Sequence, residues 1–149
     1  MSRIYLDHAA TSPLRPEARA AMEEGFARWA NPSSPHAEGR RARAALEDAR
    51  ERIKRALGWE GEAIFTSGAS EALWIALNRA KVARRIVSAV EHDAVFRAAP
   101  DAAILDDAMT LGAGTLVAIH HVNSETGTIN PVSDMARAIR PGGAVLLSD

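Results

Sequence analysis

The sequence contains no cysteine, and this absence limits both its architecture and its chemistry. A chain without cysteine has no disulfide framework and no cysteine-ligated metal site. It also lacks any apolar stretch long enough to cross a bilayer. Basic and acidic residues nearly balance, at a net charge of −1, so no overall field directs the chain towards nucleic acid or a membrane surface.

The N-terminus has no basic region followed by an apolar one, so we expect no secretory signal and a cytoplasmic location. The composition, 47% hydrophobic and 25% charged, is ordinary for a soluble globular protein.

The spacing of apolar residues predicts strands that alternate with helices. The expected strands cover residues 3–7, 63–65, 85–90, 102–105, 115–119 and 144–147. The expected helices cover residues 17–30, 36–57, 69–77, 93–99 and 131–140. This alternation predicts an α/β fold with a mostly parallel sheet flanked by helices.

Polar side chains follow several of the predicted strands. They are Ser67 to Ser70 after the second strand, Glu91 and His92 after the third, residues 120–125 after the fifth, and Asp149 after the last. Ligands of parallel sheets bind beyond the carboxyl ends of the strands, so we expect these side chains to converge on one site.

The turn at residues 66–68 leads into a helix, and we expect the Ser67 hydroxyl to cap it. Gly68 allows close approach of a ligand, and a helix N-terminus can hold a phosphate. A capped helix start without any ligand has the same pattern, so this stretch alone leaves both interpretations open.

One ligand chemistry fits the whole set of polar residues. A phosphate would bind at the helix start, His92 would stack on a flat ring, and Asp149 would hold a protonated ring nitrogen. Pyridoxal 5'-phosphate has these features. His92 can also be a strand-end histidine without a role. His120 and His121 are a poor metal pair, because adjacent side chains of a strand point to opposite faces.

Segments spread along the chain carry a family resemblance. They are YLDHAATSP at residues 5–13, NPSSPHAEGR at 31–40, FTSGASEAL at 65–73, EHDAV at 91–95 and HVNSETG at 121–127. In this order they resemble the cysteine desulfurases, in the class V branch of the aminotransferases. The resemblance implies the N-terminal part of a fold-type I, pyridoxal-phosphate-dependent transferase. Residues 1–149 would form the N-terminal segment and the first half of the large cofactor-binding domain. The remainder of that domain and a C-terminal small domain would lie outside this chain.

The resemblance also implies roles for individual residues. Ala69 and Ser70 match the pair that holds the cofactor phosphate, and Ser70 keeps the hydroxyl of the family's usual threonine. His92 matches the histidine that stacks on the cofactor ring and shuttles protons, which makes it the candidate catalytic residue. Asp149 matches the partner of the pyridine nitrogen.

Asn123 and Ser124 stand where the family commonly has two asparagines, and both are candidate cofactor-binding residues. Ser124 departs from that pattern. Its shorter side chain puts one contact in doubt, which Asn123 or a water can replace.

Other groups that the resemblance implies are absent. The family binds its cofactor covalently through a lysine beyond the aspartate, but Lys54 and Lys81, the two lysines here, do not match that position. The nucleophilic cysteine and the arginine that grips the substrate carboxylate are also expected later. We therefore expect this chain to be completed by a missing C-terminal segment or a second polypeptide.

The implied activity converts L-cysteine to L-alanine and leaves the sulfur on an enzyme cysteine as a persulfide. The motifs at 31–40 and 121–127 favour the group that serves iron–sulfur cluster assembly or tRNA thiolation. We expect a homodimer of the completed unit and a sulfur-acceptor or scaffold protein as partner, without nucleic acid, membrane or metal. The alternatives are a selenocysteine lyase, a transaminase, or an inactive fragment kept for subunit pairing.

Overall fold

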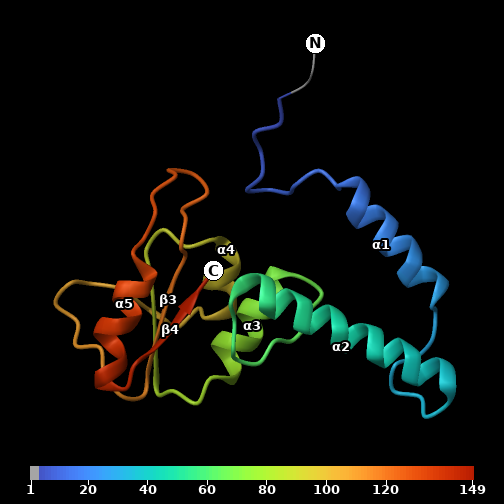
Figure 1. The fold of residues 1–149 in the computed structure, drawn as a ribbon. Coiled ribbons are helices and arrows are strands. Elements are labelled where there is room, and N and C mark those ends of the chain that lie inside the picture. The colour runs from blue at the N-terminus through green and yellow to red at the C-terminus, as the bar shows by residue number, and fades with distance from the viewer. Residues whose placement is uncertain (1–3) are drawn as a thin grey trace. The chain divides into compact units, whose positions relative to one another are not determined.

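The computed structural model describes residues 4–149, and the chain divides into two compact units (Figure 1). We call Met1–Phe65 unit 1 and Thr66–Asp149 unit 2. Among the described residues, no helix combines the length and apolar character needed to cross a membrane.

The described part of unit 1 contains two helices, joined by residues 28–36. Helix α1 covers Pro16–Ala27 and starts with proline, whose ring fixes φ and which has no N–H to leave unpaired. Helix α2 covers Ala37–Leu57 and ends at Gly58, which adopts a left-handed φ of 61°. Both helices were predicted, although α1 ends before the expected residue 30. No residue of α1 is buried, and its apolar residues Ala18, Met22 and Phe26 are exposed in the described structure, as is Trp29 just beyond the helix.

The start of α2 depends on a glycine. The Nδ1 atom of His36 accepts the Gly39 N–H over 3.2 Å and so caps the helix. Gly39 is buried, and a Cβ placed on it would lie 2.3 Å from the carbonyl oxygen of Ser34 and 2.8 Å from that of Asn31. Because these neighbours are backbone atoms, only glycine fits this turn.

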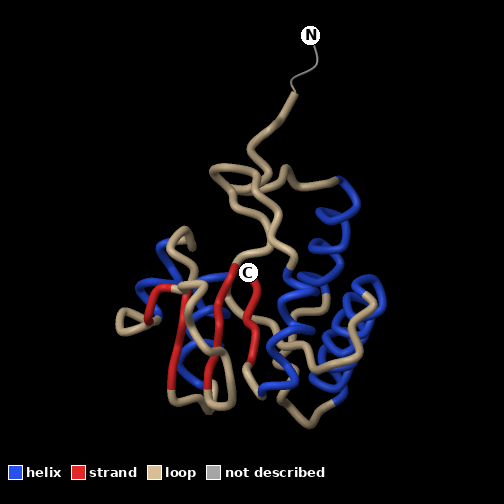
Figure 2. Tube along the Cα trace, turned by 90° about the vertical axis from the view of Figure 1, so that its left-hand side faces the viewer, coloured by secondary structure: helices blue, strands red, loops and turns tan. Residues whose placement is uncertain are grey.

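Unit 2 contains a four-stranded sheet with the order β2-β1-β3-β4 (Figure 2). The strands are β1 (Arg84–Val87), β2 (Ala103–Ile104), β3 (Thr115–Ile119) and β4 (Val145–Ser148). All pairings are parallel, with Ile86 opposite Val117 and Val117 opposite Leu146. The predicted parallel α/β architecture is therefore confirmed, and the carboxyl ends of all four strands meet at one edge.

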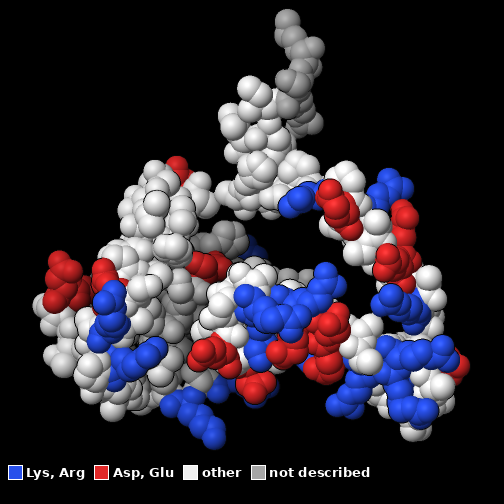
Figure 3. Space-filling model, in the orientation of Figure 1, with Lys and Arg blue, Asp and Glu red and all other residues white. Residues whose placement is uncertain are grey.

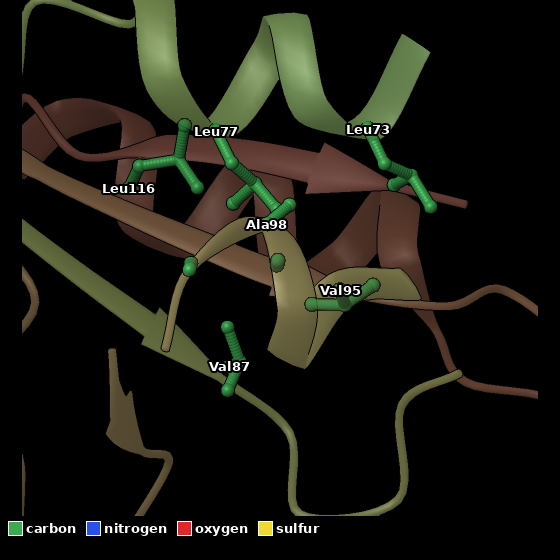
Figure 4. Close-up of a cluster of buried hydrophobic side chains, with 8 residues drawn as sticks. Leu73, Leu77, Val87, Val95, Ala98 and Leu116 are labelled. Carbon is green, nitrogen blue, oxygen red and sulfur yellow. The ribbon is translucent and has the colours of Figure 1, made fainter. Parts of the chain in front are cut away.

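The helices of unit 2 are α3 (Ala69–Arg79), α4 (Asp93–Ala98) and α5 (Val132–Ile139), which a short 3-10 turn follows at Arg140–Gly142. Helices α3 and α4 pack together over the sheet, and their side chains form the buried cluster shown in Figure 4 together with side chains of β1 and β3. Its members are Leu73, Leu77, Val87, Val95, Ala98, Ala99, Leu116 and Ala118. Full burial of one such large side chain contributes about 2 kcal/mol, so this cluster is the main stabilising element of unit 2.

Two predicted strands do not form among the described residues. Residues 4–7 have no strand pairing, and residue 3 of that prediction lies outside the described residues. The Tyr5 hydroxyl instead donates to the carbonyls of Asp7 and Thr11. Residues 63–65 also form no strand, and the ring of Phe65 lies under the Arg50 guanidinium. A strand requires a neighbouring strand for its backbone hydrogen bonds, and an apolar run alone cannot supply one.

Candidate active site

The first turn of α3 lies at one wall of the candidate site. Gly68 is its N-cap residue, with Ala69 and Ser70 as the first helical residues. The predicted cap by the Ser67 hydroxyl is wrong, because α3 has no side-chain cap. The N–H groups of a first helical turn have no acceptor within the helix, and the helix dipole is positive there. This turn can therefore bind an anion.

A carboxylate organises the loop before α3. The Ser67 backbone N–H donates to Glu71 Oε2 over 2.5 Å, and the Thr66 hydroxyl donates to the Gly68 carbonyl over 3.1 Å. The backbone N–H of Ser67, with help from its side chain, lowers the pKa of Glu71 below its ordinary value of 4.5. Glu71 thus folds the loop back onto α3, which the sequence pattern did not reveal.

His92 caps α4 through its ring. Its Nδ1 atom accepts the Ala94 N–H over 3.1 Å, so Nδ1 carries no proton in this arrangement. The other ring nitrogen, Nε2, is the one left for a ligand or a proton. The side chain is exposed, so a ligand can reach it.

Ser70 and His92 face the same cavity. Its volume is about 480 Å³, and its lining residues are Ser70, Trp74, His92, Asp93, Ala94, Arg97 and Ala98. Trp74 and Arg97 were not identified from the sequence. Helical spacing could have identified them. Trp74 follows Ser70 by one helical turn, and Arg97 follows Asp93 by one turn, so each lies on the same helix face as another residue of the cavity. Arg97 forms an exposed ion pair with Asp93.

Buried polar contacts join the carboxyl ends of β1 and β3. Glu91 Oε1 accepts the backbone N–H of His120 over 3.0 Å and lies 2.9 Å from His120 Nδ1. The Glu91 side chain is 1% exposed and that of His120 is 9% exposed. The sequence placed both residues after strands but did not reveal the pair, which depends on the register of β1 against β3.

The side chain of Asn123 uses most of its hydrogen-bonding groups within the chain. Its Nδ2 donates to the Val90 carbonyl over 3.3 Å, and its Oδ1 accepts the N–H groups of Glu125 and Thr126 over 2.9 and 2.8 Å. One Nδ2 hydrogen remains for another acceptor. Ser124 is exposed in the turn that Asn123 closes.

Asp149 directly follows β4, and its side chain is exposed. Its backbone carbonyl accepts the His121 N–H over 2.9 Å, which holds it beside the end of β3. The structure therefore brings Asn123, Ser124 and Asp149 to the same sheet edge as His92, but none of these three lines the cavity of Ser70 and His92.

A sequence profile of the Aminotransferase class-V family matches residues 4–108. The chain belongs to this family. The cysteine desulfurase IscS of Dictyoglomus turgidum is 35% identical in an alignment of 165 positions, gaps included, which covers 90% of this chain and 41% of that protein. A cysteine desulfurase of a Frankia species is 38% identical in an alignment of 151 positions, which covers 96% of this chain and 36% of that protein. The chain thus spans less than half of either relative.

Solved structures agree with this family membership. The NifS-like protein from Rickettsia africae matches with a TM-score of 0.83 and 26% identity, over 98% of this chain and 47% of that one. DndA from Streptomyces lividans matches with a TM-score of 0.71 and 32% identity, over 98% and 49% of the two chains. These matches confirm the predicted fold type.

Proposed function

We propose that this chain forms part of a pyridoxal-phosphate-dependent cysteine desulfurase, which converts L-cysteine to L-alanine and passes the sulfur to an enzyme cysteine as a persulfide. One observation carries the proposal. Ser70, in the first turn of α3, and His92, at the start of α4, line one cavity in a class V chain. The relatives named as cysteine desulfurases support the choice of reaction.

The residues present fit the cofactor's phosphate. We assign this group to Ala69 and Ser70, because the first turn of α3 offers backbone N–H groups without helical acceptors and a hydroxyl donor. The nearby Glu71 carboxylate accepts the Ser67 N–H of the preceding loop, and α3 has no side-chain cap that would occupy the N–H groups of its first turn.

The residues also fit a flat, protonated ring. His92 would lie against it and move a proton at Nε2, because Nδ1 is engaged by the Ala94 N–H. The exposed Asp149 carboxylate would accept the N–H of the pyridine ring, and Ser124 or the free Nδ2 hydrogen of Asn123 would add a polar contact. When bound, pyridoxal phosphate supplies an electron sink for the substrate's α-carbon.

We propose the same division of the enzyme as the sequence implies, with residues 1–149 as the N-terminal segment and first half of the large domain. The covalent lysine, the thiol and the carboxylate-binding arginine would belong to the part of such an enzyme that this chain does not match. The completed unit would be a cytoplasmic homodimer that donates sulfur to an acceptor or scaffold protein for iron–sulfur clusters or tRNA thiolation.

A titration with pyridoxal phosphate tests the site. The backbone amide NMR signals of the 149-residue chain are followed, together with those of the Ser70→Ala and Ser133→Ala variants. Ser133 is the second residue of α5, as Ser70 is of α3, so its variant is a matched control. We expect shifts at Ala69, Ser70 and His92, and affinity about 10-fold weaker in Ser70→Ala alone, since a hydrogen bond to a charged group is lost.

Equal affinity in both variants, or shifts confined to other residues, would contradict the assigned phosphate site. In the completed enzyme, alanine release from L-cysteine supports the desulfurase. Release from selenocysteine alone would instead favour the lyase, and transfer of the amino group to a keto acid would favour the transaminase.

A further inference from the structure

Glu91 is buried at the candidate site, yet the proposed reaction gives it no task. It immediately precedes His92, and its side chain is almost fully enclosed. Its carboxylate contacts His120 twice, through the backbone N–H and the Nδ1 atom of that residue. Because Glu91 Oε1 accepts, His120 Nδ1 has to donate, which is the opposite of the role of Nδ1 in His92.

These contacts continue the strand pairing beyond the sheet. The ladder between β1 and β3 reaches the Ser88 N–H, which donates to the Ala118 carbonyl over 3.1 Å. Beyond it, the Val90 carbonyl accepts from Asn123 and the Glu91 carboxylate accepts from His120. Side chains thus hold the loop that leads to His92 against the end of β3.

On its other side, His92 is held by α4. Its Nδ1 accepts the Ala94 N–H, and Val95 is fully buried in the core of unit 2. His92 therefore lies between two anchors, the Glu91–His120 contact before it and the first turn of α4 after it. Movement of either anchor would change the direction of Nε2.

We propose that Glu91 and His120 form a positioning pair that fixes the His92 ring towards the cavity it shares with Ser70. The role of His92 in proton transfer rests on the proposed function. The claim that the pair fixes the His92 ring rests on the hydrogen bonds alone. Loss of either partner leaves a buried polar group without its hydrogen bond, so the loop is expected to rearrange. The pair acts through His92 and does not touch the substrate.

The test follows His92 in the full chain without cofactor. The variants are Glu91→Ala, Glu91→Gln, His120→Ala and the double variant Glu91→Ala/His120→Ala. Two signals are read, the imidazole nitrogen shifts of His92 and the hydrogen-exchange rate of the Ala94 N–H, which reports its bond to His92. Val117→Ala is the control, because Val117 is fully buried in β3 and its loss weakens the core without touching the loop.

We expect Glu91→Ala to accelerate Ala94 exchange about 10-fold and to move the His92 Nδ1 signal towards that of a free imidazole. Glu91→Gln keeps an acceptor oxygen and is expected to preserve most of both signals. His120→Ala should act in the same direction as Glu91→Ala but less strongly, because the His120 backbone N–H remains. The double variant should equal Glu91→Ala, since the two residues act as one unit. Val117→Ala should leave the His92 shifts unchanged.

Unchanged His92 signals in folded Glu91→Ala, or equal changes in Val117→Ala, would overturn the positioning role. If Glu91→Ala does not fold, His120→Ala decides, and unchanged His92 signals there would overturn the role equally. A titration with pyridoxal phosphate separates the two proposals. If His92→Ala binds pyridoxal phosphate with unchanged affinity, the proposed role of His92 in the reaction is contradicted. The His92 and Ala94 signals measured without cofactor still test the positioning pair.

Discussion

The backbone N–H of His121 donates to the backbone carbonyl of Asp149 over 2.9 Å and so joins the ends of β3 and β4. This bond uses main-chain atoms alone. The Asp149 carboxylate is exposed and takes no part in it. The side chain can therefore be changed without loss of the contact that holds the strand end.

Asp149→Ala is expected to leave the fold intact and to keep weak binding through the phosphate. It should nearly abolish alanine release by the completed enzyme, because the carboxylate that keeps the ring nitrogen protonated is lost. The measurements are backbone amide shifts, for the fold, and alanine formed from L-cysteine. Ser148→Ala, one residue earlier on β4, is the control. Near-normal alanine release by Asp149→Ala would show that this carboxylate does not serve the cofactor.

The stability of unit 2 should depend on pH through Glu71. The folded state lowers the Glu71 pKa below 4.5, because the ionised carboxylate accepts the Ser67 N–H. The resulting stabilisation is present above the unfolded pKa and is lost as the pH falls through the lower, folded value. Glu71→Gln should remove this part of the acid dependence. Urea unfolding between about pH 6 and about pH 3 measures it.

Glu125→Gln serves as the control for this pH series, since Glu125 is also exposed. If the free energy of unfolding falls equally with pH in the wild-type chain and in Glu71→Gln, the hydrogen bond to Ser67 does not contribute to stability.

Gly39→Ala should destabilise unit 1 by about 1–3 kcal/mol, the cost of forcing a methyl group into a filled space. The added Cβ would meet the carbonyl oxygens of Ser34 and Asn31, which are backbone atoms and cannot easily move. Gly25→Ala is the matched control, because nothing lies within 4 Å of its Cβ position in α1. That change should stabilise by about 0.5–1 kcal/mol. The measurement is urea unfolding followed by helical circular dichroism, and equal effects of the two variants would refute the packing argument.

The 149-residue chain by itself should bind pyridoxal phosphate weakly and release no alanine from L-cysteine. Sulfur transfer requires an attacking thiolate, and this sequence contains no cysteine. The assay uses the purified chain of confirmed mass with cysteine and cofactor, with a complete cysteine desulfurase as the positive control. Alanine release at an enzyme-like rate would require a different nucleophile among the residues present.

Local patterns predicted much of unit 2 correctly. The strand at 115–119 was predicted at its exact bounds, because a run of apolar, mostly β-branched or small residues between turns fits a strand buried on both faces. The helix at 131–140 was also predicted, and α5 forms there with half-buried residues at helical spacing, Val132, Met135, Ala136 and Ile139. The spacing of apolar residues and the composition of a segment are local properties, so they can be read from the sequence alone.

Other expectations failed where the outcome depended on distant partners. Residues 4–7 and 63–65 have the composition of strands but no strand pairing in the described structure. Ser67 has the right side chain for an N-cap, but α3 begins one residue later than this requires, so Gly68 is the N-cap residue and the helix has no side-chain cap. A local pattern shows what a segment can do, and tertiary contacts select among the options.

The sequence by itself determined the alternation of strands and helices in unit 2, the parallel class of the sheet and the family motifs around Ser70, His92 and Asp149. Tertiary structure alone decided which of these residues share a cavity and which only share a sheet edge. It also decided that Glu91 is paired with His120, because the residues lie 29 positions apart and meet only in the parallel register of β1 and β3. Hydrogen bonds of this kind depend on distances of about 3 Å, and only the folded chain sets those distances.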